Sequence, residues 1–329
     1  MAAAASTSAA AGGSGSASGV GGADDRVDDA QLRRRPTVII VCGLAGAGKS
    51  TVTRRLATAL GERGKRTYFI NLDPAVRGEL GFAASIDIRD TVSYANVMER
   101  YTLGPNGAIM TCLNLFATRF DQVLSLVERR ADELDYVVCD TPGQIEMLTW
   151  SASGQIVMDT LALAFPTLLL YVVDTPRAAS PTTFVSNMMY ACSIMFKSQL
   201  PFVVCFNKTD VARHDFAMEW MRDFDAFQEA LDDDDSYMGS FTRSMSLALD
   251  EFYRQLNAIG LSAATGAGVD KAMEAFERAR GEYFDEYRPI LERRIAQRRR
   301  IDEQEHRSQL QRLHADMGGG GRGGGGGQG

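Results

Sequence analysis

The chain has 329 residues, of which 45% are hydrophobic, and its formal net charge is −7. The acidic excess lies in the body, because residues 36–287 hold 33 acidic and 22 basic side chains, a net charge of −11. Binding to a nucleic-acid backbone needs a basic face, so we expect no direct contact with nucleic acid. No run of 18 uncharged apolar residues is present, and we therefore expect no membrane-spanning helix.

Glycine marks both ends of the chain as regions without a core. Half of the 32 glycines lie in residues 1–23 and 318–329. Segments of this composition bury too little apolar surface to offset the entropy of ordering. We therefore divide the chain into a disordered tail (1–35), one large domain (36–287), an Arg-rich terminal helix (288–316) and a Gly-rich disordered tail (317–329).

Cysteine usage and the N-terminal residues suggest a compartment. The five cysteines contain no CxxC pair and lie in apolar stretches, which is typical of reduced core thiols in an intracellular protein. The N-terminus lacks the basic start and apolar stretch of a secretory signal. We expect a cytoplasmic protein, with an organelle transit peptide as a weaker alternative.

Apolar runs rich in β-branched residues alternate with segments of helical spacing from Thr37 onward. The runs are continuously apolar, which is typical of parallel strands covered on both faces. This alternation predicts an α/β fold with a doubly wound, mostly parallel sheet and a ligand site at the carboxyl ends of its strands. The expected strands are 37–42, 67–71, 135–140, 167–174, 201–207 and 258–262. The expected helices include 49–60, 144–163, 182–197, 216–231 and 269–287.

One segment interrupts the alternation. Residues 75–134 show no convincing central strand and are mostly helical in period around a Gly104-Pro105-Asn106-Gly107 turn. An insertion of this length at the ends of the strands is usually functional. The turn by itself is more typical of a tight connection between helices.

The segment from Gly43 to Thr51 follows the first expected strand and opens the first long helix. It fits the pattern GxxxxGK[ST] of a phosphate-binding P-loop, in the strand-loop-helix context that the pattern requires. Backbone N–H groups would surround the β-phosphate, Lys49 would reach the β- and γ-phosphates, and Ser50 would place its hydroxyl on Mg²⁺. The expected phosphate-binding residues are Gly46, Ala47, Gly48, Lys49, Ser50 and Thr51.

Two carboxylates that end strands are candidates for the metal and the hydrolytic water. Asp140 ends a buried strand and begins the pattern DxxG, where a nucleoside triphosphatase holds Mg²⁺ directly or through water. Gln144 follows and can orient a water with its amide group. Asp73 ends the second strand, and it is either a turn residue before Pro74 or a ligand or proton acceptor near the γ-phosphate.

The segment Asn207-Lys208-Thr209-Asp210 fits the NKxD pattern of guanine readers. The Asp210 carboxylate would accept hydrogen bonds from guanine N1–H and the N2 amine, which adenine cannot offer. Asn207 would brace the loop, and the stem of Lys208 would cover one face of the base. Ala263 follows a later strand and offers a backbone N–H for guanine O6.

With a P-loop, Asp140-Thr141-Pro142-Gly143-Gln144, the NKxD pattern and Gly104-Pro105-Asn106 in this order, the sequence resembles the GPN-loop GTPases over residues 36–285. Longer strings add to the resemblance. They are Ile70–Ala75, Ile86–Asp90, Leu103–Gly107, Asp140–Glu146 and Thr149–Gly154.

The resemblance implies a dimer, either a homodimer or a heterodimer with another GPN-loop GTPase. In this family the GPN loop of one subunit reaches toward the γ-phosphate of the other. Carried over, Asn106 would act in trans, and Asp73 and Gln144 would complete the hydrolytic site. The resemblance also implies a role in assembly or nuclear import of a protein complex, RNA polymerase II, with its subunits or assembly factors as partners.

We therefore expect a Mg²⁺-dependent GTPase that acts as a dimeric switch, with the nucleus as a second location if it shuttles. Two alternatives stay open at this point. One is a scaffold in which nucleotide merely stabilises the dimer, and the other is an ATPase or a P-loop kinase.

Overall fold

The computed structural model describes residues 29–76, 78–231 and 256–293, together with positions 242, 249, 252, 253 and 297. The expected Gly-rich tail and most of the expected Arg-rich helix lie outside these residues. The N-terminal tail was expected to extend to residue 35, and this boundary is too late. Leu32, in α1 (Asp29–Leu32), is fully buried, and the Arg35 guanidinium donates to the Ala164 carbonyl at 2.9 Å.

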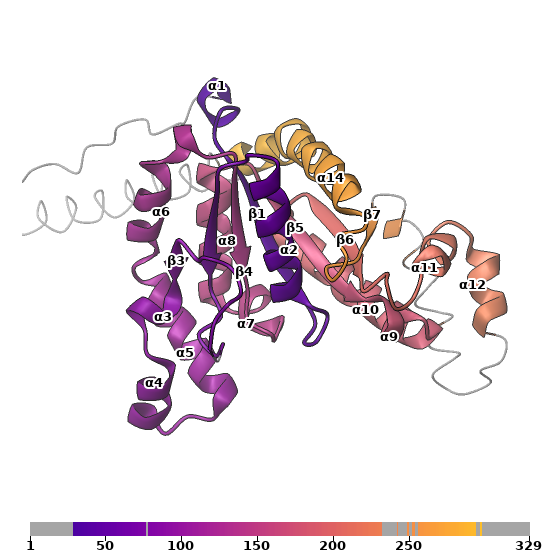
Figure 1. The fold of residues 1–329 in the computed structure, drawn as a ribbon, viewed down its shortest axis with the longest axis horizontal. Coiled ribbons are helices and arrows are strands. Elements are labelled where there is room, and N and C mark those ends of the chain that lie inside the picture. The colour runs from indigo at the N-terminus through magenta and orange to yellow at the C-terminus, as the bar shows by residue number, and fades with distance from the viewer. Residues whose placement is uncertain are drawn as a thin grey trace, which may run out of the picture.

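The core of the fold is a parallel sheet of seven strands in the order β3-β2-β4-β1-β5-β6-β7 (Figure 1). The expected doubly wound α/β architecture is confirmed, because long apolar runs such as Thr37–Gly43 are buried along their whole length. The strands are β1 (Thr37–Gly43), β2 (Thr67–Asn71), β3 (Ile86–Asp87), β4 (Tyr136–Asp140), β5 (Thr167–Asp174), β6 (Phe202–Asn207) and β7 (Asn257–Leu261).

Helices cover both faces of the sheet, and alternate residues of β1 point to opposite faces. Ile39 and Val41 belong to the core cluster that contains α2 (Lys49–Glu62) and α14 (Val269–Glu282). Ile40 belongs to the larger cluster on the other face. The helices of that larger cluster include α5 (Pro105–Ala117), α6 (Phe120–Glu128), α8 (Ala152–Ala164) and α10 (Pro181–Ser198).

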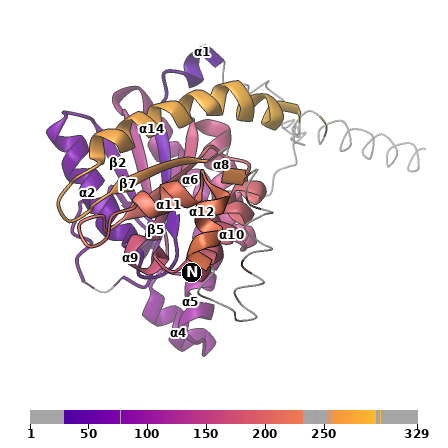
Figure 2. The same ribbon diagram turned by 90° about the vertical axis from the view of Figure 1, so that its right-hand side faces the viewer.

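The insertion between β2 and β4 is helical, as expected, but it also supplies the two-residue edge strand β3. Figures 1 and 2 show α4 and the start of α5 projecting from the end of the molecule opposite α1. Gly104 is the N-cap of α5 and Pro105 its first residue, where a proline has no N–H to leave unpaired. The remaining elements here are α3 (Ile88–Thr91), α4 (Tyr94–Tyr101) and a 3₁₀ turn (Ala131–Glu133).

Two helices expected as single elements are interrupted by side chains that cap a new helix. The segment 144–163 divides into α7 (Glu146–Thr149) and α8, because the Ser151 hydroxyl accepts from Gly154 N–H at 2.9 Å. The segment 216–231 divides into α11 (Asp215–Trp220) and α12 (Phe224–Leu231), where Asp223 accepts from the N–H of Asp225 at 2.9 Å.

The remaining short elements are α9 (Thr175–Ala178), which follows β5, and a π-helical turn (Tyr283–Tyr287), which continues α14. Four of the five cysteines are buried and all five are free thiols, consistent with the expected core role. Among the described residues, no helix combines the length and apolar character needed to cross a bilayer.

Candidate functional site

The candidate residues gather at the carboxyl ends of five neighbouring strands. The parallel register aligns Asn71 of β2 with Asp140 of β4, and Asp140 with Val41 of β1. It also aligns Asp174 of β5 with Asn207 of β6. Because all these strands run in the same direction, their terminal side chains meet at one edge of the sheet, where the chain also turns into α2.

The P-loop connects β1 to α2 with a backbone that only glycine adopts without strain. Gly43, Gly46 and Gly48 have φ values of 143°, 82° and 94°. A Cβ on Gly43 would lie 2.3 Å from the Val172 carbonyl oxygen, and one on Gly48 would lie 2.5 Å from Asn207 Nδ2. The P-loop therefore packs too closely against β5 and β6 to accept a side chain at these positions.

The Lys49 ammonium lies inside this loop. Its Nζ donates to the carbonyl oxygens of Gly43 at 2.9 Å, Leu44 at 3.1 Å and Gly143 at 3.1 Å. The side chain is buried, and this burial lowers the pKa of Lys49, although the carboxylates of Asp140 and Asp73 oppose the shift. A charged ammonium held beside the P-loop amides is suited to an anionic phosphate.

Asp140 carries an oxygen that no described side chain satisfies. Its Oδ1 accepts from the Thr53 hydroxyl at 3.2 Å, whereas the buried Oδ2 has no hydrogen-bond donor among the described residues. Burial raises the pKa of Asp140 to about 6, and the hydroxyls of Ser50 and Thr53 oppose this rise. Removing a carboxylate from water in this way is costly unless a cation compensates it.

These residues fit Mg²⁺. The exposed Ser50 hydroxyl and the unsatisfied oxygen of Asp140 are hard oxygen ligands, and Mg²⁺ usually binds one or two carboxylates together with water and substrate phosphates. No group of three or more His, Cys, Asp or Glu side chains in the described part of the chain is arranged to hold a metal. Any Mg²⁺ here would therefore depend on phosphate oxygens as further ligands.

Asp73 is both a turn residue and a neighbour of the phosphate site. Its Oδ1 accepts from Ala75 N–H at 2.9 Å, as the turn interpretation expects. Burial raises the pKa of Asp73, against the effect of the Ala75 N–H and the Lys49 charge. Asn71 holds the turn in place, accepting from the N–H of Asp73 at 3.1 Å and donating to Asp87 at 2.9 Å.

The network that supports Asp73 continues into the insertion, and the sequence analysis assigned it no role. The Arg89 guanidinium binds both carboxylate oxygens of Asp87, with Nη2 at 2.7 Å from Oδ2, and donates to the Gly78 carbonyl at 3.0 Å. Burial alone would raise the pKa of Asp87, but the hydrogen bonds from Arg89 hold it below its usual value. The only signal in the sequence was the string Ile86–Asp90.

Asn106 contacts Gln144 of the same chain. The Gln144 side-chain amide donates to Asn106 Oδ1 at 2.6 Å. Asn106 is exposed at the second position of α5, after Gly104 and Pro105. The GPN turn therefore lies next to the Gln144 of its own chain, whereas its expected contact with a second subunit stays a prediction.

The NKxD segment is tied to the P-loop on one side and to the segment after β7 on the other. Asn207 Nδ2 donates to the Ala47 carbonyl at 2.9 Å, and Lys208 Nζ donates to the Gly46 carbonyl at 3.0 Å. The Ala263 N–H, which we expected at guanine O6, donates instead to Asn207 Oδ1 at 3.1 Å. In this structure Ala263 therefore supports the loop through Asn207.

Asp210 has a partner that the sequence analysis did not identify. Its Oδ1 accepts from the Ser262 hydroxyl at 2.5 Å, and the same hydroxyl oxygen accepts from Thr265 N–H at 3.1 Å. Ser262 thereby positions the carboxylate expected to read the base. Its place directly after β7, one residue before Ala263, was the available signal.

We expect Gly48→Ala to weaken nucleotide binding by a factor of about 5 to 150, because a Cβ there would lie 2.5 Å from Asn207 Nδ2 at a φ of 94°, a strain of about 1–3 kcal/mol. The matched control is Gly61→Ala in α2, where a Cβ meets nothing within 4 Å. Fluorescence titration with a labelled nucleotide measures both affinities. Equal affinities for Gly48→Ala and Gly61→Ala would contradict the close approach of the P-loop to β6.

Comparisons with known proteins agree with this geometry. The model of a family described as "conserved hypothetical ATP binding protein" matches residues 41–282. GPN-loop GTPase 1 of Dictyostelium discoideum is 51% identical over 284 residues, which make up 86% of this chain and 72% of that protein. GPN-loop GTPase QQT2 of Arabidopsis thaliana is 54% identical over 256 residues, 78% of this chain and 67% of that protein.

The fold has a counterpart among solved structures. A GTPase from Pyrococcus abyssi, solved in its apo form, aligns with a TM-score of 0.64 and 28% identity, over 73% of this chain and 96% of that one. The sequence matches cover the P-loop, the insertion and the NKxD segment that the structure brings to one edge of the sheet. On this sequence identity and this arrangement, the chain belongs to the GPN-loop GTPase family.

Proposed function

We propose that this GPN-loop GTPase is a Mg²⁺-dependent dimeric switch that binds and hydrolyses GTP and assists assembly or nuclear import of a protein complex, RNA polymerase II. The observation that carries the proposal is the meeting of Lys49, Asp140 and Asp73 at the sheet edge that also holds Asp210. Phosphoryl transfer asks for positioning and charge neutralisation more than for covalent chemistry, and these residues supply both.

Each residue of the phosphate half has a task that follows from its position. Lys49 neutralises charge on the β- and γ-phosphates, and the N–H groups of residues 46–51 surround the phosphates at the N-terminus of α2. Ser50 and Asp140 would hold Mg²⁺, which supplies charge neutralisation between the β- and γ-phosphates. The raised pKa of Asp140 is consistent with a carboxylate that a cation would stabilise in its charged form.

Gln144 would orient the attacking water, and the Asp73 carboxylate would accept its proton. A side-chain amide can accept from the water and donate to phosphate at the same time. Burial raises the pKa of Asp73, which makes this carboxylate a better proton acceptor than an exposed one. In this structure Asn106 contacts the amide of Gln144 in its own chain, and in the proposed dimer it would act at the site of the second subunit.

Guanine specificity is assigned to Asp210, although the matching family model is described as ATP-binding. Asp210 is exposed, and its Oδ1 is positioned by Ser262. A carboxylate matches the two N–H donors on the Watson–Crick edge of guanine and would face the N1 acceptor and the C2–H of adenine. ATP binding with equal affinity would instead support the ATPase alternative.

We expect Asp210→Asn to lower GTP affinity by about a hundredfold, because the new amide turns a donor toward the guanine N2 amine, so one hydrogen bond to a charged acceptor is lost and the other becomes neutral. The same variant should gain affinity for xanthosine triphosphate, whose C2 carbonyl accepts from the new amide. Competition against labelled GDP measures both effects, and Asp215→Asn, an exposed carboxylate in α11, is the control. Unchanged GTP preference in Asp210→Asn would contradict the assignment of guanine recognition to this residue.

The proposal of a dimer is supported by apolar side chains exposed on the face that carries α7, α8 and α10. Trp150 is 42% exposed and packs against Tyr190, and Ile156 and Met189 are exposed near them in sequence. Trp150 lies close in sequence to Gln144, so a subunit seated here would also lie near the hydrolytic site. Charged residues are depleted in the centre of such interfaces.

A complementation experiment tests whether Asn106 acts in trans. Gln144→Ala and Asn106→Ala should each abolish hydrolysis, whereas a coexpressed mixture should regain about a quarter of the wild-type rate. The reason is that half of the randomly formed dimers pair a Gln144→Ala subunit with an Asn106→Ala subunit. Each such dimer has one intact site out of two. Phosphate release measures the rate, and Asn114→Ala, an exposed residue of α5, is the control.

A dimeric mixture without regained activity would show that Asn106 acts only on the Gln144 of its own chain. That outcome would match the contact in the structure and contradict the proposed contribution of a second subunit.

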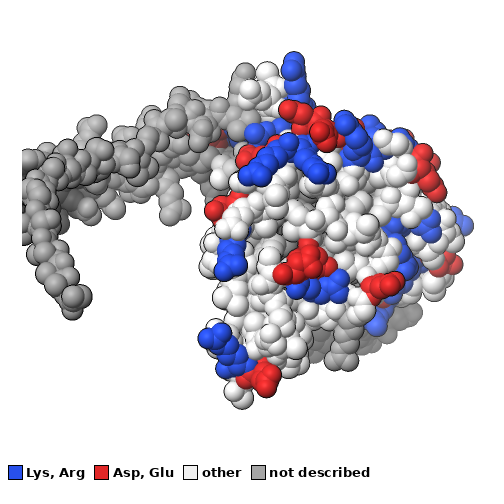
Figure 3. Space-filling view, turned by 60° about the vertical axis from the view of Figure 1, so that its left-hand side comes forward, with Lys and Arg blue, Asp and Glu red and all other residues white. Residues whose placement is uncertain are grey.

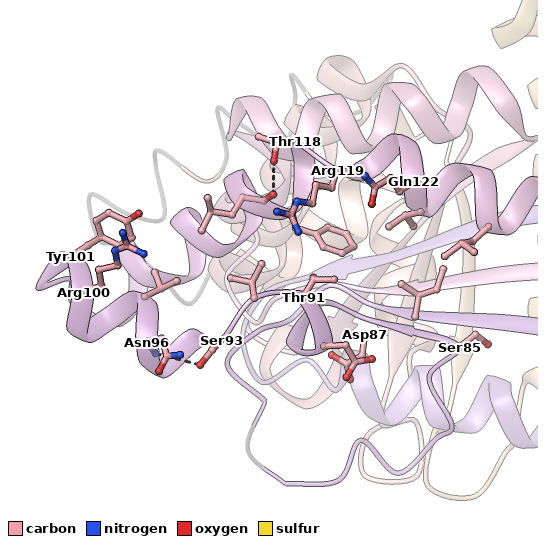
Figure 4. Close-up of a pocket in the computed structure, with 18 residues that line it drawn as sticks. Ser85, Asp87, Thr91, Ser93, Asn96, Arg100, Tyr101, Thr118, Arg119 and Gln122 are labelled. Carbon is pink, nitrogen blue, oxygen red and sulfur yellow. Dashed lines mark hydrogen bonds between the residues drawn. The ribbon is translucent and has the colours of Figure 1, made fainter. Parts of the chain in front are cut away.

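A groove in the insertion supports the proposal that the useful output is protein binding. Its volume is about 530 Å³, and it lies between α3 and α4 on one side and α5 and α6 on the other (Figure 4). It contains none of the P-loop residues, so it is separate from the nucleotide site. Tyr101 and Leu126 on its border are each 50% exposed.

Figure 3 shows that uncharged side chains cover most of one face of the molecule, between small groups of charged ones.

Loss of contacts to the γ-phosphate would alter the insertion, because the network of Asp73, Asn71 and Asp87 joins the phosphate site to β3 and α3. We place this switch in the cytoplasm, with shuttling to the nucleus alongside its cargo. Its partners would be RNA polymerase II subunits or assembly factors and a second GPN-loop GTPase subunit.

A partner experiment separates the switch from a scaffold. Wild type should capture different partners with GDP and with a non-hydrolysable GTP analogue, whereas Lys49→Ala should lose this difference because it lacks the phosphate-binding ammonium. Affinity capture from cell extract followed by mass spectrometry measures the partner set. Lys65→Ala, at an exposed ion pair outside the site, is the control. Partner sets that do not depend on nucleotide would support the scaffold alternative.

A further inference from the structure

Asp174 is a buried carboxylate at the nucleotide edge of the sheet that belongs to none of the sequence motifs. It ends β5, and the parallel register places it beside Asn207, the first residue of the NKxD segment. Its side chain is only 11% exposed. It therefore lies between the P-loop, which follows the neighbouring strand β1, and the loop proposed to read guanine.

The main partner of Asp174 is Lys208. The Lys208 ammonium lies 2.7 Å from Asp174 Oδ2 and also donates to the Gly46 carbonyl at 3.0 Å. Lys208 has a φ of 67°, a left-handed conformation that side chains other than glycine rarely adopt. The carboxylate and the P-loop carbonyl together define the path of the Lys208 stem across the site.

The surroundings of the second oxygen of Asp174, Oδ1, indicate that this carboxylate acts through its charge and not through packing. Oδ1 is buried and has no hydrogen-bond donor among the described residues. Among the described residues, the other cation near the carboxylate is Arg177, whose Nε lies 3.5 Å from Oδ2 and whose side chain is 72% exposed. A buried carboxylate with one unsatisfied oxygen is unfavourable for folding by itself, so packing alone does not explain it.

We infer that Asp174 is a positioning residue for guanine-nucleotide binding and acts through Lys208. By pairing with the ammonium, it keeps the Lys208 stem where it covers the base and keeps the ammonium on the Gly46 carbonyl of the P-loop. The ion pair thereby adds to the contact between Asn207 and Ala47 in joining the base half of the site to the phosphate half. The inference rests on the proposed assignment of residues 207–210 to guanine.

This role predicts a defined change in kinetics. Loss of the ion pair leaves the base uncovered and the P-loop less constrained, so GDP and GTP should both dissociate faster, and by similar factors. The rate of the chemical step should change little, because Asp174 contacts neither Lys49 nor Gln144 among the hydrogen bonds of the site. A purely structural role would instead lower the melting temperature of the nucleotide-free protein.

The test is a double-mutant cycle on GDP dissociation. Asp174→Asn keeps the shape of the side chain, and Lys208→Met keeps the apolar stem without the charge. Each single variant should raise the dissociation rate of labelled GDP by about tenfold, and the double variant should be no worse than either one. Arg177→Ala, which removes the exposed partner of the same carboxylate, is the control and should stay within about twofold of wild type.

Three outcomes would overturn the inference: unchanged dissociation in Asp174→Asn, additive effects in the double variant, or an effect matched by Arg177→Ala. If Asp174→Asn lowers the nucleotide-free melting temperature, the cycle is repeated with Asp174→Glu, which keeps the charge and should restore slow dissociation. Wild type that binds ADP as tightly as GDP would contradict the guanine assignment instead. The double-mutant cycle is then measured on ADP dissociation, and additive effects of the two substitutions would again overturn the role of Asp174.

Discussion

The close approach of the P-loop to the end of β6 is the constraint on which the rest of the site depends. Asn207 donates to the Ala47 carbonyl, accepts from the Ala263 N–H and fills the space that a Cβ on Gly48 would need. One side chain thus joins three segments that are far apart in the sequence. Because the phosphate loop and the base loop are held at a fixed separation, both ends of a nucleotide can be bound without rearrangement.

The other half of the site is organised around charges that the fold has removed from water. Burial lowers the pKa of Lys49 and raises those of Asp140 and Asp73, which favours the neutral form of each group. Each group also has a partner that opposes the shift. Such a site is expensive to form, and phosphate and Mg²⁺ are the ligands whose charges would compensate it. The hydrogen bonds among Asn71, Asp87 and Arg89 connect this half of the site to the insertion, which carries the groove and the GPN turn.

Much of the sheet was predictable because its strands are continuous apolar runs ending in polar motif residues. The edge strand β3 was missed, since two residues carry no periodic signal. The break between α7 and α8 was missed because the Ser151 cap competes with an otherwise helical pattern. Gly154 also permits this tight turn, because a Cβ there would collide with the Leu148 carbonyl at the end of α7.

The sequence by itself determined the chemistry of the site: a P-loop, a carboxylate at the end of each of two strands and a guanine-reading pattern, each recognisable because the residues that act together are neighbours in the chain. Only the tertiary structure decided the supporting contacts, namely Ser262 on Asp210, Asp174 on Lys208 and Asn106 on Gln144. These partners are separated by 34 to 52 residues. Their pairing follows from strand order and register, which local spacing in a single sequence does not encode.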